Sequence, residues 1–185
     1  MERCSWVKLT EPIYVKYHDE EWGIPVFDDQ QLFEMLCLEG AQAGLNWLTI
    51  LKRREGYRQA FDYFDVEKIV QYDDAKLEDL KQDERIIRNR LKIASVVTNA
   101  KSYVNIQQKH RSFSNYIWSF VEHKPIINRW ERIEDVPVTT EISDRMSKQL
   151  KKDGFKFVGS TICYAYMQAV GLVKDHTTNC FCYKE

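Results

Sequence analysis

The segment 160–170 is the strongest constraint on the fold of this chain, because it is apolar on nearly all of its faces. Its residues run Ser-Thr-Ile-Cys-Tyr-Ala-Tyr-Met-Gln-Ala-Val. A helix that is hydrophobic all round needs protein on every side, so we expect it at the centre of the molecule. The chain has 185 residues, of which 44% are hydrophobic, and this is enough for one sizeable core. We therefore expect a single domain over 1–185.

Capping residues and glycines predict helices through most of the remaining chain. Asp28 and Asp29 precede a stretch with an apolar face, and Gly44 ends it. Asn46 precedes another stretch, which would turn the basic run 52–54 outward. The expected helices are 30–43, 47–61, a short one opened by Asp65, 86–103, one from Ser143 or Asp144 to Gly154, and 160–170. Strand signals are weak and confined to pieces near Ile126 and Val136, so the sequence predicts an all-α fold.

The composition indicates a soluble protein of the cytoplasm. No apolar run approaches the roughly 18 residues that a membrane-spanning helix needs, and the first residues lack the apolar core of a signal peptide. Five cysteines at uneven spacing are typical of a reduced compartment. Cys37 and Cys163 fall in apolar helical segments, where we expect buried thiols. The net charge of −1 argues against a uniformly basic surface but leaves room for local ones.

Potential metal ligands stand at the two ends of the chain. They are Cys4, His18, His176 and Cys180. Two thiolates and two imidazoles suit a tetrahedral structural zinc ion, which would join the terminal segments, about 1–25 and 172–185. Cys182 is an alternative fourth ligand. Ordinary core or surface positions are the other interpretation of these residues, because the first two ligands are far apart in sequence.

The stretch 143–171 has the layout of a helix-hairpin-helix. Its turn runs from Gly154 to Gly159, and a helix begins at Ser160. Backbone amides of such a turn and of a helix N-terminus can face a phosphate, and glycine lets a DNA strand approach closely. An ordinary glycine-terminated turn has the same pattern. The expected DNA contacts here are Gly154, Lys156, Val158, Gly159, Ser160 and Thr161. Arg85, Arg88, Arg90 and Lys92 could form a second basic edge, although acidic residues lie just upstream of it.

Glu39 lies at the edge of the apolar face of the 30–43 helix, between Leu32 and Met35. A carboxylate there points toward a poorly hydrated region, where an unpaired charge is costly and a cationic ligand would compensate it. Aromatic side chains close to it in sequence could stack on a flat base, although each of them alone is more typical of a core. These are Trp6, Tyr14, Tyr17, Trp22 and Trp47. Together they predict a pocket for a cationic aromatic ligand.

Several stretches of the sequence carry a family likeness. Two are long and specific: Tyr-His-Asp-Glu-Glu-Trp-Gly at 17–23 and Leu-Glu-Gly-Ala-Gln-Ala-Gly-Leu-Asn-Trp at 38–47. The others are Glu-Arg-Cys at 2–4, the hairpin turn at 154–159 and Asp-His at 175–176. They occur in order and without large gaps from Cys4 to Cys180. On these motifs the chain resembles the type I 3-methyladenine DNA glycosylases.

The resemblance implies an all-α, helix-hairpin-helix DNA glycosylase fold with a zinc site joining the N- and C-terminal segments. The implied zinc ligands are Cys4, His18, His176 and Cys180. Glu39, Tyr17 and Trp47 fall where the family holds the excised base. Gly44 and Leu45 fall where it fills the gap left by the flipped nucleotide. The implied substrate is double-stranded DNA containing 3-methyladenine, whose N-glycosidic bond a monomeric, monofunctional enzyme hydrolyses to leave an abasic site.

The resemblance also limits the mechanism. A base methylated at N3 is positively charged and already a good leaving group, so stacking and the carboxylate of Glu39 are expected to suffice. Many members of the wider superfamily place an aspartate downstream of the hairpin; here the nearest candidate is Asp175, which we expect to orient its neighbours instead. A non-catalytic DNA-binding module and a zinc-stabilised scaffold remain the alternatives. An iron-sulfur glycosylase is disfavoured because the cysteines are not clustered.

Overall fold

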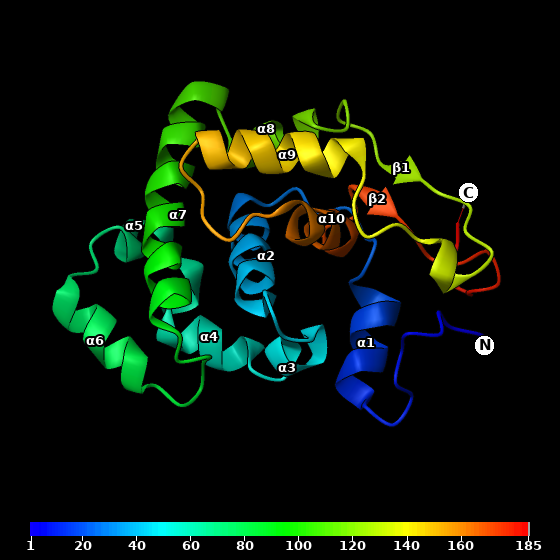
Figure 1. Cartoon of the computed structure of the whole chain (residues 1–185), viewed down its shortest axis with the longest axis horizontal. Coiled ribbons are helices and arrows are strands. Elements are labelled where there is room, and N and C mark those ends of the chain that lie inside the picture. Colours follow the sequence, from blue (N-terminus) through cyan, green and yellow to red (C-terminus); the bar gives the residue numbers. More distant parts are fainter. Residues whose placement is uncertain (185) are drawn as a thin grey trace.

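The computed structural model describes residues 1–184 and is built mainly of helices (Figure 1). In chain order they are α1 (Pro12–Glu20), α2 (Asp29–Gln42), α3 (Trp47–Leu51), α4 (Arg54–Ala60), α5 (Val66–Ile69), α6 (Asp74–Gln82), α7 (Arg90–His110), α8 (Phe113–Ser119), α9 (Glu141–Lys152) and α10 (Ser160–Ala169). The remaining elements are the 3-10 turns η1 (Asp62–Phe64) and η2 (Ile133–Asp135) and the strands β1 (Ile126–Ile127) and β2 (Val173–Lys174), which pair in parallel. The prediction of a helical fold is confirmed.

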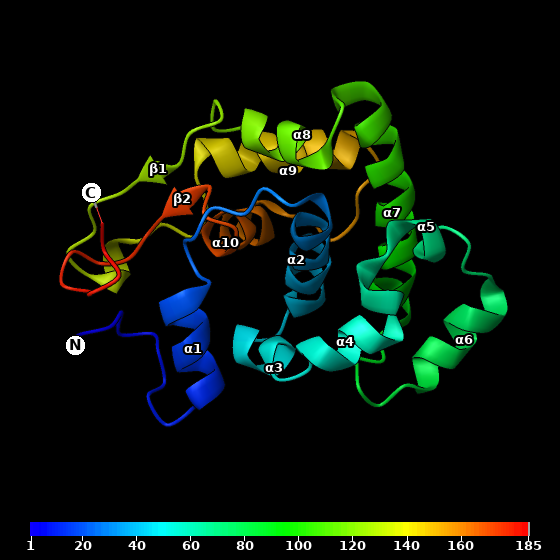
Figure 2. The ribbon, with the colours of Figure 1, turned by 180° about the vertical axis from the view of Figure 1, so that it is seen from behind.

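Helix α10 occupies the centre of the molecule, as its apolar sequence predicts. Figures 1 and 2 show it with α9 along one side and α2 along another. Cys163, Tyr166, Met167 and Val170 have no exposed surface, so α10 is enclosed by protein. None of the helices within 1–184 combines the length and hydropathy of a membrane-spanning segment.

The prediction of a single helix over 47–61 is wrong, because the helix is interrupted at Lys52 and Arg53, which separate α3 from α4. The break turns Arg54 inward, where its Nη2 donates to Glu21 Oε1 at 2.9 Å. The basic run 52–54 is therefore not uniformly outward. Gly56 of α4 also packs against Arg85 so closely that a Cβ would lie 2.7 Å from the Cβ of that residue.

Two other helices begin at residues that differ from the predicted ones, because other side chains cap them. Helix α7 begins after Asn89, whose side chain accepts from Lys92 N, and not at Ile86. Helix α9 begins after Thr140, because the side chains of Thr140 and Ser143 form a reciprocal capping box. A strand forms at the predicted piece near Ile126, whereas Val136 only ends η2. Helices α1, α6 and α8 were not predicted.

Gly171 fixes the chain leaving α10 against the segment before α2. Its φ is +73°, and an added Cβ would lie 2.4 Å from Ile24 C and from Pro25 N. Because both the backbone angle and the backbone contact exclude a side chain, we expect Gly171→Ala to lower the free energy of unfolding by about 3 kcal/mol or more. Chemical denaturation measures this. Gly159→Ala is the control, since its Cβ would meet nothing within 4 Å and should leave stability nearly unchanged.

Candidate functional site

A cavity of about 180 Å³ lies between α1, α2, α3 and α10. Its lining residues are Trp6, Tyr14, Tyr17, Trp22, Glu39, Gln42, Trp47, Ile133, Ala165 and Gln168. All six residues predicted to contact a base are therefore brought together around one space. Helix α1 contributes Tyr14 and Tyr17 one turn apart, and α2 contributes Glu39.

The cavity holds polar atoms that have no hydrogen-bond partner within residues 1–184. They are the donors Trp6 Nε1 and Trp47 Nε1 and the acceptors Glu39 Oε2 and Gln42 Oε1. A buried polar group without a partner costs about 1–3 kcal/mol. Four such atoms lining one space are explained by a ligand that presents both donors and acceptors at its edge.

Aromatic rings form the walls of the cavity. The rings of Tyr17 and Trp47 lie 5.3 Å apart and are tilted by 46°. Trp6 packs edge-on against Trp22 with ring centroids 5.1 Å apart, and its ring lies 5.0 Å from that of Tyr14. These contacts hold the rings in place before any ligand enters, so a flat ligand finds prepared faces on which to stack.

Burial changes the ionisation of Glu39. Its side chain is 3% exposed, and loss of hydration raises its pKa from 4.5 to about 8. Glu39 therefore favours its protonated form to a higher pH than an exposed glutamate does, which differs from the unpaired charge expected from the sequence. Burial likewise raises the pKa of Tyr17 and Tyr14, and the nearby Glu39 adds to both shifts. The two phenols therefore stay neutral.

The raised pKa makes stability depend on pH. Below pH 4.5, Glu39 is protonated in both the folded and the unfolded chain. Between about pH 4.5 and 8, the unfolded chain ionises Glu39 while the folded chain does not, so the free energy of unfolding falls as the pH rises. Glu39→Gln has no such proton. We expect the stability of the wild type relative to Glu39→Gln to decrease over this window, as measured by urea denaturation at a series of pH values; a constant difference would contradict it.

Two glutamines of the cavity were not assigned a role from the sequence. Gln42 lies on α2 one turn after Glu39, and its Oε1 is buried and unpartnered. Gln168 of α10 donates from Nε2 to Asp175 Oδ2 at 2.8 Å, which fixes the orientation of its amide. The i, i+3 spacing of Glu39 and Gln42 is the signal that could have indicated the first of them.

Asp175 is fully buried and accepts four hydrogen bonds. The donors are Asn128 Nδ2, Trp130 Nε1, Tyr164 Oη and Gln168 Nε2, at 2.6–2.8 Å. Protein donors thus occupy all four lone-pair positions of the Asp175 carboxylate. Asp175 orients its neighbours, and this agrees with the expectation that it does not act on the sugar.

The four potential metal ligands of the chain termini converge into one buried cluster. Cys180 Sγ lies 3.4 Å from His18 Nε2 and 3.6 Å from His176 Nδ1, and Cys4 Sγ lies 3.5 Å from His176 Nδ1. Tetrahedral zinc, with Zn–S of about 2.3 Å and Zn–N of about 2.0–2.1 Å, sets sulfur to nitrogen separations of about 3.5 Å. The cluster therefore fits a metal ion in donor type and in spacing.

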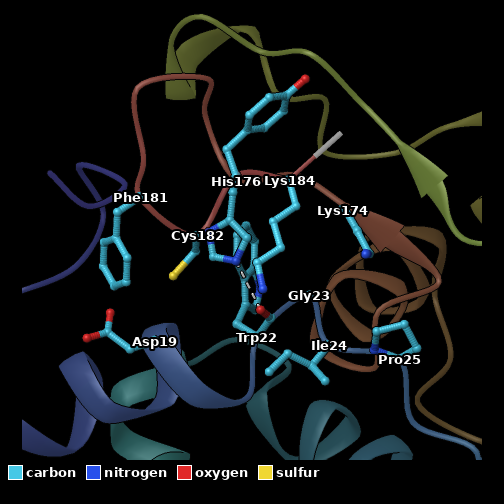
Figure 3. Close-up of a pocket in the computed structure, with 11 residues that line it drawn as sticks. Asp19, Trp22, Gly23, Ile24, Pro25, Lys174, His176, Phe181, Cys182 and Lys184 are labelled. Carbon is cyan, nitrogen blue, oxygen red and sulfur yellow. Dashed lines mark hydrogen bonds between the residues drawn. The ribbon is translucent and has the colours of Figure 1, made fainter. Parts of the chain in front are cut away.

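Each histidine of the cluster is held by its second ring nitrogen. His18 Nδ1 donates to Asp19 Oδ1 at 2.7 Å, and Asp19 in turn accepts a bidentate bond from Arg3. His176 Nε2 donates to Trp22 O at 3.1 Å, as the dashed line in Figure 3 marks. These bonds fix the tautomers that leave His18 Nε2 and His176 Nδ1 free to bind a metal.

Cys182 stands outside this four-residue cluster. Its thiol groups with His18 and Asp19 instead, and Figure 3 shows it at the wall of a cavity of about 420 Å³ beside His176. The alternative in which Cys182 replaces Cys180 as fourth ligand is therefore not favoured. Trp22 lines both this cavity and the one that holds Glu39.

The hairpin between α9 and α10 offers backbone amides and open space. An added Cβ on Gly159 would meet nothing within 4 Å, and Lys156 and Thr161 are exposed. The side chain of Val158 is buried, so this residue can offer only its backbone. The hydroxyl of Ser160 bonds to Ser143 Oγ and Asp144 Oδ1 and is already partnered. Gly154 ends α9 with φ +95°.

The loop that follows α2 exposes the other predicted DNA contacts. Gly44 has φ +77°, and the Leu45 side chain is 43% exposed. An isolated exposed leucine held by a left-handed glycine suits insertion into a base stack. Gly40 follows Glu39 on α2, and a Cβ added to it would lie 3.2 Å from the Cβ of Phe157. The hairpin therefore packs directly on α2.

Two residues of the second basic edge, Arg85 and Lys92, bond to other parts of the protein. Arg85 makes a bidentate bond to Asp83 and also donates to Gln59 Oε1. Lys92 points into the protein, where its Nζ donates to two backbone carbonyls of α2 and its C-cap. Arg85 and Lys92 are therefore already partnered within the protein, and the phosphate-binding edge stays a prediction.

The chain is similar to known proteins over nearly its whole length. A family described as methyladenine glycosylase matches residues 6–183. DNA-3-methyladenine glycosylase 1 of Escherichia coli (strain K12) is 50% identical over 183 residues, covering 99% of this chain and 97% of the relative. The DNA-3-methyladenine glycosylase of Haemophilus influenzae is 50% identical over 180 residues, covering 97% of each.

Solved structures agree with these relatives. A crystal structure of 3-methyladenine DNA glycosylase I superposes with a TM-score of 0.97 at 48% identity, covering 99% of this chain and 100% of the other. The enzyme from Staphylococcus aureus, solved to explain its recognition of 3-methyladenine, gives 0.96 at 36% identity, covering 100% and 98%. The resemblance drawn from the motifs at 17–23 and 38–47 is confirmed, and the chain belongs to the methyladenine glycosylase family.

Proposed function

We propose that this chain is a DNA repair glycosylase that hydrolyses the N-glycosidic bond of 3-methyladenine in double-stranded DNA and leaves an abasic site. The cavity carries the proposal, because flat aromatic walls and unpartnered donors and acceptors meet around Glu39. Membership of the family and the names of the relatives support the same substrate. We further propose that residues 1–185 form one domain, active as a monomer in the cytoplasm.

The edge chemistry of adenine matches the atoms in the cavity. Adenine presents an amino group as a donor and N7 as an acceptor. Glu39 Oε2 and Gln42 Oε1 are placed to accept, and the indole N–H groups of Trp6 and Trp47 are placed to donate. Tyr17 and Trp47 would stack on the base, while Tyr14, Trp6 and Trp22 complete the walls.

Glu39 would act as the catalytic group. The lesion is rotated out of the duplex at an unstacking cost of a few kcal/mol, and N3-methylation gives it a positive charge. This charge favours the ionised form of Glu39, so binding of the cationic base draws the pKa down from about 8. The carboxylate then stabilises the charge that develops as the glycosidic bond breaks and water attacks the sugar.

We propose that Cys4, His18, His176 and Cys180 hold one structural Zn²⁺. Four protein ligands complete the coordination, so such an ion supplies stability and no open position for chemistry. The chain's own contribution is to bring residues 172–184 against α1, next to Trp22 of the cavity.

DNA contacts are proposed at two places. Leu45, presented by Gly44, would fill the gap left by the flipped nucleotide. The hairpin would face a phosphate with the amides of Gly159, Ser160 and Thr161, at the N-terminus of α10. The backbone of Val158, the exposed Lys156 and the turn at Gly154 complete this contact.

Release of free base tests the function. Duplex DNA treated with a methylating agent is incubated with the protein, and the released bases are separated by chromatography. We expect 3-methyladenine in the soluble fraction and abasic sites in the DNA. Binding to abasic duplex without any base release would identify a non-catalytic module and overturn the proposal.

A further inference from the structure

The C-terminal end of α2 is held by a lysine from another helix. The last turn of α2 contains no basic residue, although its final carbonyls need donors and favour a positive charge. Lys92 of α7 supplies both, because its Nζ donates to Ala41 O at 2.8 Å and to Ala43 O at 2.6 Å. Ala43 directly precedes the Gly44 turn. Lys92 therefore fixes the backbone from which Leu45 projects.

The hairpin is held by a second residue of the same helix. Asn99 is 3% exposed. Its Oδ1 accepts from Lys156 N at 2.8 Å, and its Nδ2 donates to Lys156 O at 3.2 Å. Both polar groups of one hairpin residue are thus satisfied by a single amide side chain, and the neighbouring turn keeps its shape.

These two anchors share one side of α7. Lys92 and Asn99 are seven residues apart, or about two helical turns and 10.5 Å along the axis. Figure 1 shows the connection between α9 and α10 running beside α7. A groove of about 340 Å³ lies alongside, lined by Leu91, Ala94, Ser95, Thr98, Lys156 and Phe157. Helix α7 therefore sets the distance between the loop at 43–46 and the hairpin at 154–159.

We propose that Lys92 and Asn99 are positioning residues that hold these two loops in the spacing at which they engage one DNA duplex. The proposal rests on the proposed function, in which both loops contact DNA. A loop held at only one end could still touch a phosphate, but Leu45 and the hairpin would no longer reach their contacts together. A misplacement of about 1 Å can lower a rate by about a hundredfold.

The test separates the loops from the cavity. In Lys92→Met, we expect excision from methylated duplex and affinity for abasic duplex to fall by about ten- to a hundredfold. Affinity for free 3-methyladenine, measured by tryptophan fluorescence, should stay within about twofold, because Lys92 does not line the cavity. Lys101→Met is the matched control. Lys101 is exposed and lies on the opposite side of α7, so its removal should change none of these values appreciably.

Salt dependence distinguishes positioning from a direct phosphate contact. A positioning role predicts weaker binding with an unchanged slope of log affinity against log salt. A slope smaller by about 0.9 in Lys92→Met would show that the lysine neutralises a phosphate, and this would overturn the proposal. Unchanged duplex affinity would overturn it as well.

Asn99→Ala provides an independent arm in case Lys92→Met fails to fold. The same pattern is expected: free-base binding retained, and duplex binding and excision lost together. Equal excision by both folded variants and the wild type refutes the positioning role while leaving the glycosylase assignment standing. A wild type that releases no 3-methyladenine and binds no abasic duplex refutes the assignment itself.

Discussion

Replacing Glu39 by glutamine is expected to lower the rate of 3-methyladenine release by about a hundredfold or more, because it removes the negative charge that stabilises the transition state. The fold should not change. Burial raises the pKa of Glu39 and so favours its protonated form, and an amide has nearly the shape of a protonated carboxyl group. The measurement is single-turnover release of base from methylated duplex, with circular dichroism and metal content as checks on the structure.

Glu34→Gln is a matched control on the same helix. Glu34 is also partly buried, and burial raises its pKa, but its carboxylate pairs with Arg58 and lies outside the cavity. Its replacement should leave the release rate within about twofold of the wild type. Full activity of Glu39→Gln would remove Glu39 from the mechanism.

Replacing Cys180, one of the four proposed zinc ligands, is expected to have the largest effect on stability. In Cys180→Ser, we expect the midpoint of thermal unfolding to fall by about 10 °C or more, together with loss of bound zinc. The reason is that three buried ligands lose their common partner and the segment 172–184 is released from α1. Differential scanning calorimetry and metal analysis measure the two quantities.

Cys182→Ser controls for the loss of a thiol in the same segment. The Cys182 side chain is outside the four-residue cluster, so zinc content and unfolding midpoint should match the wild type. Chelation of the wild type should reproduce the effect of Cys180→Ser. A stable, metal-free wild type with normal base release would contradict the proposed structural zinc.

Six of the ten residues that line the cavity could be predicted because each leaves a local signal. Glu39 interrupts the apolar face of its helix, and Tyr17 and Trp47 stand in specific motifs. The chemistry of Cys4, His18, His176 and Cys180 also indicated a metal site, with Cys182 as an alternative ligand, and the family resemblance selected these four residues. Helix α1 was missed although it carries Tyr14, Tyr17 and His18, because its β-branched and aromatic residues have weak helical preference and only Pro12 marks its start.

What the sequence could not provide depends on contacts between distant segments. A lysine such as Lys92 is expected at the surface, and only the tertiary fold brings its side chain to the end of α2. Arg54 turns inward because its guanidinium group pairs with the carboxylate of Glu21. Gln168 becomes part of the cavity once Asp175 fixes its amide. Tertiary contacts of this kind override local preference and have no periodicity to detect.

The placement of the sulfur atoms has a consequence for how the protein withstands methylating chemicals. Such electrophiles attack thiolates, and burial suppresses the thiolate form. Cys37 and Cys163, which lie outside the four-residue cluster, are buried, and loss of hydration raises the pKa of both thiols, that of Cys163 to about 12. Only Cys182 is partly accessible among the five. The thiols of Cys37 and Cys163 are thus protonated and enclosed, which protects the core of the protein from the reagents that create its substrate.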